Sequence, residues 1–402
     1  MNRQLRIAPL AVVLVATNLV ACAADPPEDG GPTGSGGSGA GPGNTGSGGR
    51  SGGGGSGSGG NPAPPCPGEG GALSRLHVEG NQIKNACGGT VVLRGISLVD
   101  LGAIVAYEGA NGVTKRIDDL VANGLAGHVV RLPVYPRTNV NSEYPYYSPL
   151  PFPVGPPAPS TASGSHMEIT ADEYVSMVLR PAVDYAASKG LYTIIDYHQI
   201  DDTSGQSATD ATTFWTMVAP RFKDDANVLY EAYNEPIDLK LGSSSAARWE
   251  AYKPHAQAWI DAIRAGAPDT IIIVGSPSWS QNMSGAAASP LQGTNLVYTA
   301  HVYPGNWSST FKSEVATCIA ARPVFITEWG YTSGSSTDMN LKAPSASWGP
   351  DFQKIVDANG ASWTAWVADK AWAPPIYATD GTDLTDFGML VKGWLAAKPD
   401  LN

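Results

Sequence analysis

The segment NVLYEAYNEP, residues 227–236, joins an apolar run to a polar ending. Its run VLY is typical of a short buried strand, and Asn234 and Glu235 follow at the C-terminal end of that strand. A glutamate next to a proline is also a common way for a chain to leave a strand. The segment alone therefore leaves two interpretations open, a functional carboxylate or an ordinary strand ending.

A second segment favours the functional interpretation. PVFITEWG, residues 323–330, again runs from an apolar strand pattern into a glutamate, Glu328. The strands of a β/α barrel converge at their C-terminal ends, so Glu235 and Glu328 can face one substrate there. Two such carboxyl groups are what double displacement at a glycosidic bond requires, one as acid/base and one as nucleophile.

Short apolar strands alternate with helical patterns along most of the chain, which predicts an α/β fold of the (β/α)8 TIM barrel type. Such a barrel commonly takes about 250 residues, and the chain has 402. We expect a short hairpin before the barrel, within residues 76–94, and a long proline-rich loop at residues 144–159. The expected strands cover residues 91–96, 128–132, 192–196, 228–232, 270–274, 296–300, 324–327 and 362–366, and the clearest helix covers residues 246–264.

The N-terminal part differs in composition from the rest. Residues 1–21 have a basic start and an apolar run too short for a membrane span, as in a signal peptide. The run LVAC, which ends at Cys22, resembles a bacterial lipoprotein signal, in which the cysteine carries the lipid; an ordinary cleaved signal is the alternative. Residues 22–65, rich in Gly, Ser and Pro, are expected to form a flexible tether, and residues 66–402 the catalytic barrel. The resemblance implies export and a lipid anchor at the surface or outer membrane of a bacterial cell, with secretion as the alternative.

The chain contains four cysteines, and none has the CxxC spacing of a zinc or redox site. Cys66 and Cys87 flank the expected hairpin, and in an exported protein they can form a disulfide. Cys318 lies in an apolar helical stretch and is expected to be a buried free thiol. The sequence leaves open whether Cys66 and Cys87 are paired.

The charge and histidine patterns argue against several classes of function. The formal net charge is -11 and Lys and Arg do not cluster, which argues against a nucleic-acid partner. The histidines occur singly, without HExxH or a comparable ligand spacing, so a metal-dependent hydrolase is disfavoured. We therefore expect no metal and no cofactor, a monomeric protein, and a neutral polysaccharide such as β-glucan or cellulose as the substrate.

Polar and aromatic residues recur at the expected strand ends, where barrel chemistry gathers. They lie in the segments VVRLPV, IIDYH, YEAYNEP, IIIVGSPSWSQN, YTAHVYPG, FITEWG and SWTAW, which carry Arg131, His198, Asn234 with Glu235, Trp279, His301 with Tyr303, Glu328 and Trp366. In this order, the segments resemble those of the family 5 glycoside hydrolases, the retaining cellulases. The resemblance runs from about residue 90 to the C-terminus.

The resemblance implies roles for the main residues of this set. Glu235 would be the acid/base, Glu328 the nucleophile, and Asn234 would bind the 2-hydroxyl of the sugar. Trp366 would stack on a sugar ring. The chemistry requires the same residue types. A nucleophilic carboxylate must stay ionised, and a nearby cation such as Arg131 favours its ionised form. The acid must begin protonated, which burial and the second carboxylate favour.

The chain departs from the family pattern at two places. In the cellulases that resemble it around Trp279, a His and a Trp follow the first strand and bind sugar, whereas this chain reads SLVDLGAIVAYEG there. Lys370 is a candidate sugar ligand, but its spacing from Trp366 is one residue short of the family pattern. Trp307 also suits an apolar sugar face, and the sequence leaves open whether it lines the cleft. The sequence therefore defines the residues that contact sugars far from the cleaved bond least well.

The residues and the resemblance together predict a retaining endo-β-1,4-glucanase. A β-mannanase or another β-glucanase would keep the same catalytic pair and differ in contacts along the cleft. A carbohydrate-binding lipoprotein without catalysis is a further alternative, which the presence of both Glu235 and Glu328 disfavours. The context of Trp279 favours glucan over mannan, because a flat ring suits the equatorial substituents of glucose.

Overall fold

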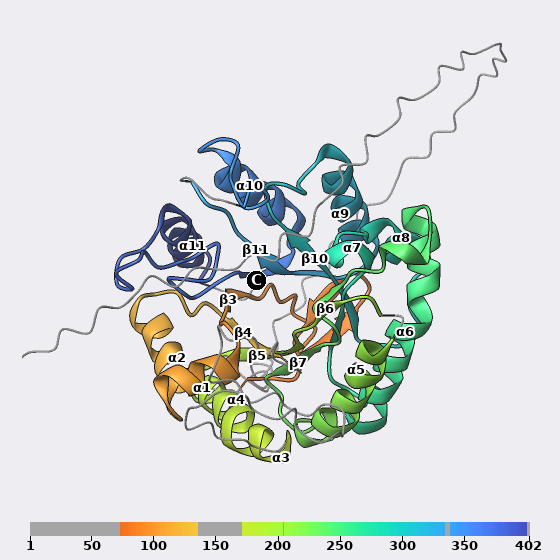
Figure 1. Cartoon of the computed structure of the whole chain (residues 1–402), viewed down its shortest axis with the longest axis horizontal. Coiled ribbons are helices and arrows are strands. Elements are labelled where there is room, and N and C mark those ends of the chain that lie inside the picture. Colours follow the sequence, from red (N-terminus) through yellow and green to blue (C-terminus); the bar gives the residue numbers. More distant parts are fainter. Residues whose placement is uncertain (1–72, 136–170, 204, 334–337, 400–402) are drawn as a thin grey trace, which may run out of the picture. The chain divides into compact units, whose positions relative to one another are not determined.

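The computed structural model describes residues 73–135, 171–203, 205–333 and 338–399. Within this part of the chain, eight parallel strands close into a barrel that helices surround (Figure 1). The strands follow the order β10-β11-β12-β3-β4-β5-β7-β9, so β12 lies opposite β7. This arrangement confirms the predicted (β/α)8 TIM barrel. The barrel strands are β3 (Arg94–Ser97), β4 (Val129–Val134), β5 (Tyr192–Tyr197), β7 (Val228–Glu231), β9 (Ile272–Val274), β10 (Leu296–Val302), β11 (Val324–Trp329) and β12 (Ser362–Ala365).

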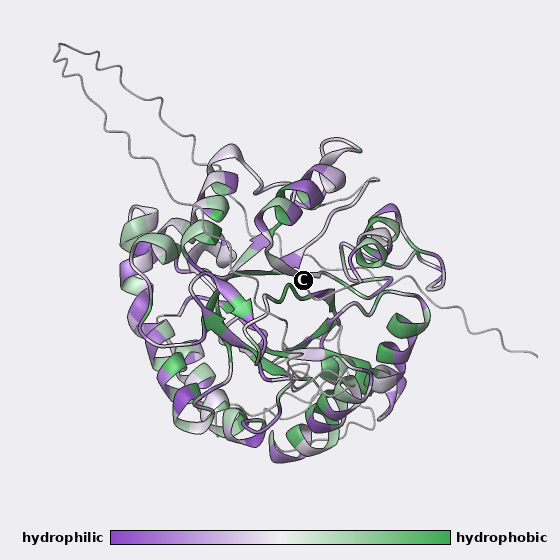
Figure 2. Cartoon of the chain, turned by 180° about the vertical axis from the view of Figure 1, so that it is seen from behind, coloured by the Kyte–Doolittle hydropathy of each residue, from purple (hydrophilic) through white to green (hydrophobic). Residues whose placement is uncertain are grey.

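The helices connect the strands and cover the outside of the barrel. Helix α6 begins where the side chain of Ser244 accepts a hydrogen bond from the backbone of Ala247, and it buries an apolar face that includes Trp249 and Trp259. Figure 2 shows the contrast between apolar strands and helices of mixed polarity. None of the described helices combines the length and apolar character of a membrane span. The helices are α1 (Leu101–Glu108), α2 (Gly112–Ala122), α3 (Ala171–Tyr174), η1 (Val175–Leu179), α4 (Arg180–Ser188), α5 (Gln206–Val218), η2 (Ala219–Arg221), η3 (Leu239–Leu241), α6 (Ser245–Gly266), α7 (Pro277–Ser280), α8 (Met283–Ala288), α9 (Ser309–Ala321), α10 (Trp348–Asn359) and α11 (Asp386–Ala397).

An antiparallel hairpin precedes the barrel, as predicted. It consists of β1 (His77–Glu79) and β2 (Gln82–Lys84). Leu76 and Ile83 pack in one apolar cluster with residues inside the barrel, among them Ile194. The hairpin therefore closes the N-terminal end of the barrel and leaves the C-terminal end of the strands to the functional residues.

Side chains inside the barrel change from apolar to polar along the strands. Ile194 and Leu229, on β5 and β7, belong to the apolar cluster at the N-terminal end. Two residues further on each strand, Asp196 and Glu231 are fully buried and face the same interior, because successive inward positions are two residues apart. Buried charges require partners, so this change marks the level at which the site begins.

Some predictions concern residues outside the described part of the chain. They are the signal peptide at residues 1–21, Cys22, the tether that ends at residue 65, Cys66 and the loop at residues 144–159. Cys87 is disulfide-bonded, but its partner is not among the described residues, so the pairing with Cys66 stays a prediction. Cys318, on α9, is a buried free thiol, as predicted.

Candidate active site

Arg131 is the centre of the polar residues inside the barrel. It lies on β4 and is fully buried. Its Nε donates to Oε2 of Glu231 (2.7 Å), its Nη1 to Oε1 of Glu328 (2.8 Å) and its Nη2 to Oδ1 of Asn234 (2.6 Å). Nη2 also lies 3.0 Å from Oδ2 of Asp196. Because the donors of a guanidinium have fixed directions, these contacts set the positions of all four partners.

Glu231 and Thr327 form a polar layer beneath Glu328. The hydroxyl of Thr327 donates to Oε1 of Glu231 (2.7 Å) and lies 2.6 Å from the hydroxyl of Thr299. The pairing of β10 with β11 shifts register between Thr299 and His301, which places an extra residue in β11. Thr327 and Glu328 are neighbours in sequence, yet both reach the interior, because the extra residue interrupts the normal alternation.

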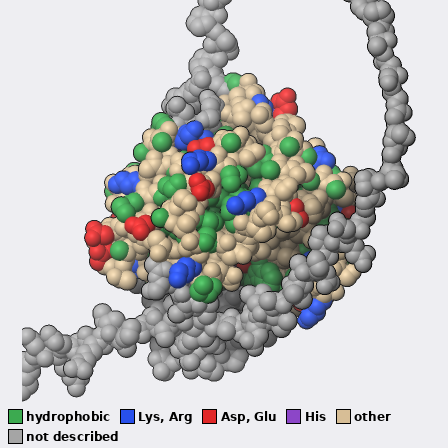
Figure 3. Space-filling view, turned by 90° about the horizontal axis from the view of Figure 1, so that it is seen from above, with side chains coloured by type: hydrophobic (Ala, Val, Ile, Leu, Met, Phe, Trp, Pro, Cys, Tyr) green, Lys and Arg blue, Asp and Glu red, His purple; other side chains and the backbone are tan. Residues whose placement is uncertain are grey.

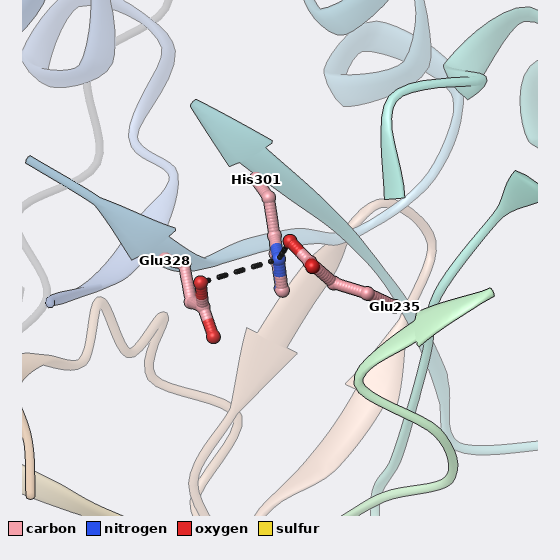
Figure 4. A group of neighbouring side chains, drawn as sticks. All are labelled: Glu235, His301 and Glu328. Carbon is pink, nitrogen blue, oxygen red and sulfur yellow. Dashed lines mark hydrogen bonds and ion pairs between the residues drawn. The ribbon is translucent and has the colours of Figure 1, made fainter. Parts of the chain in front are cut away.

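His301 lies between the two predicted catalytic glutamates (Figure 4). Its Nδ1 is 2.8 Å from Oε1 of Glu235 and 3.4 Å from Oε2 of Glu328. Oε2 of Glu328 also accepts a hydrogen bond from the hydroxyl of Tyr303 (2.7 Å). One oxygen of each glutamate and one nitrogen of His301 all lie within 4.8 Å of one another. The fold thus makes neighbours of two carboxyl groups that are far apart in sequence.

The surroundings of these carboxyl groups push their pKa values apart. Burial raises the pKa of Glu235, and the charge of Glu328 adds to this effect against the opposing influence of His301. Burial also raises the pKa of Glu328, but the positive charges of His301 and Arg131 outweigh burial and hold that pKa below its ordinary value. The site can therefore hold one protonated and one ionised carboxyl group at the same pH.

The residues beneath the pair have defined charge states too. Burial lowers the pKa of His301, but the surrounding glutamates, Glu328 first, outweigh it and raise that pKa to about 10. Burial raises the pKa of Glu231, but Arg131 and His301 outweigh it and lower that pKa to about 2. The imidazole is therefore protonated and the carboxylate of Glu231 ionised across the neutral pH range.

Glu235, His301 and Glu328 are also close enough together to serve as ligands for a metal ion. Metal binding would have to displace a proton from the imidazole, and the raised pKa of His301 makes the loss of that proton less favourable. The hydrogen bond of His301 to Glu235 already accounts for their close approach. The charge states of the group favour an acid/base pair over metal coordination.

Aromatic rings line one side of the site. His198 stacks on Trp366, with ring centroids 5.3 Å apart and planes 8° apart, and the guanidinium of Arg131 lies 5.9 Å from the Trp366 ring. Nδ1 of His198 is 2.6 Å from Oδ2 of Asp196. Burial, assisted by Arg131, lowers the pKa of His198 to about 3, so its ring is neutral. Neutral flat surfaces of this kind suit the apolar face of a sugar.

Trp279 lies on an unusual turn that follows β9. Ser278, Trp279 and Ser280 have φ angles of 63°, 57° and 56°. Residues other than glycine rarely adopt this left-handed conformation, and such residues concentrate at functional sites. The hydroxyl of Ser280 donates to the backbone carbonyl of Asn234 (2.9 Å). The turn is therefore joined to the segment that carries the predicted acid/base.

Comparison with known proteins identifies the family. Residues 88–371 match the sequence pattern of one protein family, which is described as cellulase (glycosyl hydrolase family 5). The chain belongs to this family. The barrel is therefore a glycoside hydrolase domain of family 5.

Curated relatives of this family 5 chain include several endoglucanases, and two of them show how far the likeness extends. Endoglucanase Z of Dickeya dadantii is 31% identical over 218 residues, which cover 54% of this chain and 48% of that protein. Endoglucanase MaCel5A of a Microbulbifer species is 28% identical over 301 residues, which cover 73% of this chain and 50% of that protein. The chain thus matches about half the length of these relatives.

Solved structures share the fold. The β-glucanase SdGluc5_26A of Saccharophagus degradans has a TM-score of 0.66 and 22% identity, over 82% of this chain and 94% of that one. Cellulase Cel5C_n has a TM-score of 0.64 and 26% identity, over 81% of this chain and 93% of that one. The shared fold therefore covers nearly all of both solved chains and 81–82% of this one.

The structure brings most of the predicted site residues of this family 5 chain together. Hydrogen bonds, ion pairs or ring contacts connect Arg131, His198, Asn234, Glu235, His301, Tyr303, Glu328 and Trp366. Between described residues, no such contact joins Trp279 or Lys370 directly to this group. Lys370 is exposed and lies beside Gly381. Trp307 packs edge to face on Phe311 and Phe352, so it belongs to the packing of the helices and not to the cleft.

The sequence does not single out Asp196, Glu231 or Thr327, although all three are buried in this family 5 site. One signal points to the first two. A carboxylate inside an otherwise apolar strand must find a partner, and IIDYH and VLYE contain one each. Asp196 pairs laterally with Glu231 in the sheet, which places both carboxyl groups beside Arg131.

Proposed function

We propose that this chain is a retaining endo-β-1,4-glucanase that works by double displacement. The observation that carries the proposal is the short distance between Glu235 and Glu328. One carboxylate oxygen of Glu235 lies within 4.8 Å of one carboxylate oxygen of Glu328. Retaining glycosidases hold their two carboxyl groups about 5–5.5 Å apart, whereas inverting enzymes need about 6.5–9.5 Å to admit a water molecule. The geometry therefore supports direct attack by one carboxylate.

In the first step, Glu328 attacks the anomeric carbon and Glu235 protonates the departing oxygen. Arg131 and Tyr303 bind one carboxylate oxygen each of Glu328, which keeps the nucleophile ionised and oriented. The raised pKa of Glu235 favours its protonated, acidic form. The leaving chain carries away that proton, and the sugar becomes an ester of Glu328.

In the second step, water cleaves this ester. Esterification removes the negative charge of Glu328, which is one of the influences that raise the pKa of Glu235. The pKa of Glu235 therefore falls in the intermediate, so Glu235 can accept a proton from the attacking water. The sugar leaves with its original anomeric configuration, and both carboxyl groups return to their starting states.

Asn234 provides a donor for the sugar. Its Oδ1 accepts a hydrogen bond from Arg131, which fixes the orientation of the amide. Its Nδ2 is buried and has no hydrogen-bond partner among the described residues. Leaving such a donor unpaired costs about 1–3 kcal/mol, and a sugar 2-hydroxyl would remove that cost. A hydrogen bond that strengthens in the transition state contributes directly to the rate.

The retaining mechanism can be tested by two measurements. Proton NMR of the first product formed from cellotetraose should show the β-anomer, and a 2-deoxy-2-fluoro cellobioside should label Glu328. Glu328→Gln should lose activity by at least about 10³-fold because the nucleophile is gone. Glu250→Gln, at an exposed position on α6, is the matched control and should retain full activity. An initial α-anomer would overturn the retaining mechanism.

The proposed substrate is an unbranched β-1,4-linked glucan. Trp279 and Trp366 offer flat rings to equatorial sugar faces, and the two relatives described above are named endoglucanases. Acidic and basic side chains are interspersed on the face in Figure 3, and neither forms a broad patch there.

A substrate panel tests this assignment. We expect kcat/KM on mixed-linkage β-glucan well above that on mannan, because the axial 2-hydroxyl of mannose would point away from Asn234. Carboxymethyl cellulose should be the poorer glucan at low salt, because the chain has a net charge of -11, and the gap should narrow as salt is added. Faster hydrolysis of mannan than of any β-glucan would overturn the substrate assignment.

We further propose that the protein is exported and anchored through lipid on Cys22. The basic start, the apolar run and LVAC support this location. Wild-type protein should partition into the detergent phase, and Cys22→Ser should remain in the aqueous phase. Equal partitioning of the two proteins would contradict the anchor and leave secretion by an ordinary signal as the alternative.

A further inference from the structure

The loop after β12 carries an aromatic ring that the proposed mechanism does not use. Trp372 is partly exposed, and its ring lies edge to face against Trp366, with centroids 6.4 Å apart and planes 72° apart. It meets the ring of Tyr135 in the same way at 6.1 Å. Trp372 therefore extends the aromatic side of the site outward from Trp366.

The backbone of this loop is fixed by a buried carboxylate. Oδ1 of Asp369 accepts hydrogen bonds from the backbone N–H groups of Ala371 (2.6 Å) and Trp372 (3.1 Å). Its Oδ2 accepts from Arg116 (2.9 Å), which also donates to the carbonyl of Ala368 (3.1 Å). A ring held in this way can bind a ligand with little loss of conformational entropy.

The barrel topology tells which part of a substrate would reach Trp372. The acid/base Glu235 follows β7 and must face the departing oxygen, so the leaving chain lies on that side. Trp366 follows β12, which lies opposite β7 in the barrel. The part of the glucan that stays bound to Glu328 therefore extends toward Trp366 and, beyond it, toward Trp372.

The four residues that directly follow β3 supply no ring for that part of the glucan. Leu98, Val99, Asp100 and Leu101 follow this strand and are all buried. The chain reads SLVDLGAIVAYEG there, without the His and Trp of the resembling cellulases. A sugar next to the attacked one would thus meet Trp372 on its way out of the barrel.

We propose that Trp372 binds the second sugar, the one attached to the non-reducing side of the sugar that Glu328 attacks. This inference rests on the proposed function. The angle between the rings of Trp372 and Trp366 suits a glucan that bends at the attacked sugar, because glycosidases distort that sugar toward a half-chair or boat. Trp372 then contributes binding energy only to substrates that possess a second sugar on this side.

A pair of synthetic substrates isolates this contribution. The 2,4-dinitrophenyl β-glucoside occupies only the attacked position, and the corresponding β-cellobioside adds the second sugar. Trp372→Ala should lower kcat/KM on the cellobioside by about tenfold or more, as expected for loss of an aromatic contact. It should leave kcat/KM on the glucoside within about twofold of wild type. Trp372→Phe keeps a ring and should lose less, and Met389→Ala, at an exposed apolar position on α11, should change neither.

The outcomes separate this inference from the proposed function. Equal losses on both substrates, or no loss on either, would overturn the role of Trp372. Wild-type protein that cleaves neither substrate would contradict the proposed function instead. Calorimetry then tests the role of Trp372 without catalysis, by measuring the affinity of cellotetraose for Glu328→Gln and for the double variant Glu328→Gln, Trp372→Ala. Weaker binding to the double variant supports the contact with Trp372, and equal binding overturns it.

Discussion

Arg131 and its neighbours form a buried group in which positive and negative charges pair with each other. Burial lowers the pKa of Arg131 and of His301, but the surrounding carboxyl groups outweigh it and raise both pKa values. Burial raises the pKa of Glu231 and of Glu328, but the two cations outweigh it and lower both. Burial leaves the pKa of Asp196 and of Glu235 above the ordinary value. Pairing of opposite charges offsets part of the cost of removing them from water. The raised pKa of Glu235 therefore depends on the whole group and not on Glu235 alone.

Tyr303→Phe should move the acidic limb of the pH profile. The hydroxyl of Tyr303 donates to Glu328 (2.7 Å) and is one of the interactions that lower the pKa of this carboxyl group. Without it, Glu328 loses its proton at a higher pH, so activity fails sooner as the pH falls. A hydrogen bond to a charged group contributes about 1.5–3 kcal/mol, so kcat/KM should fall roughly 10- to 150-fold.

The control for this variant is Tyr185→Phe. Tyr185 also donates its hydroxyl to a carboxylate, Asp118 (2.6 Å), but on the exposed surface of α4. Its profile of kcat/KM against pH should coincide with that of wild type. A profile of Tyr303→Phe that moves only at its alkaline limb would show that Tyr303 acts on Glu235 instead.

The proposed catalytic pair is visible in the sequence because each glutamate lies near the C-terminal end of an apolar strand pattern. Asp196 and Glu231 are less visible, since their partners depend on how β5 and β7 align. Lys370 shows the opposite case. It is a plausible sugar ligand by its spacing, but the loop after β12 turns it toward Gly381. Local patterns identify strand ends, whereas the direction of a loop side chain depends on packing that the sequence does not display.

Strands β3 and β4 can approach only because residue 95 is glycine. A Cβ atom on Gly95 would lie 1.7 Å from the carbonyl oxygen of Val129, far inside contact distance. We expect Gly95→Ala to lower the free energy of unfolding by about 3 kcal/mol or more, since the backbone of a closed barrel cannot move aside easily. Chemical denaturation monitored by tryptophan fluorescence measures the loss.

Gly393→Ala is the matched control for Gly95→Ala. Gly393 is exposed within α11, and a Cβ there would meet no atom within 4 Å. Alanine has the higher helix propensity, so this variant should gain about 0.5–1 kcal/mol. Similar stabilities of the two variants would contradict the close approach of β3 and β4.

All eight barrel strands and the hairpin can be predicted from apolar runs and their spacing. The left-handed turn at Ser278, Trp279 and Ser280 cannot, because local propensity disfavours that conformation, whereas contacts with Asn234 and Ile237, which lie far away in sequence, help to stabilise it. The same holds for the extra residue in β11, which exists only in relation to β10. The extra residue is what allows both Thr327 and Glu328 to reach the interior of the barrel.

The stability of the barrel should not depend on the N-terminal segment of residues 23–65. Residues 26–65 are almost entirely Gly, Ser, Pro and Asn, a composition that cannot bury enough apolar surface to offset the entropy of ordering. Removal of residues 23–65 should leave the Tm within about 2 °C of wild type. A drop of more than that would show that this segment packs on the barrel.

The contacts of Arg131 also determine when activity can appear as the chain is made. Its partners lie on or after β5, β7 and β11, and Thr327 of β11 accepts a hydrogen bond through its carbonyl from Thr364 of β12. A chain that lacks its last strands has Glu235 but neither Glu328, the proposed nucleophile, nor the closed ring of strands that positions it. We therefore expect no catalysis until the last strands are in place, and two inactive fragments divided between β9 and β10 should regain activity only on reassembly.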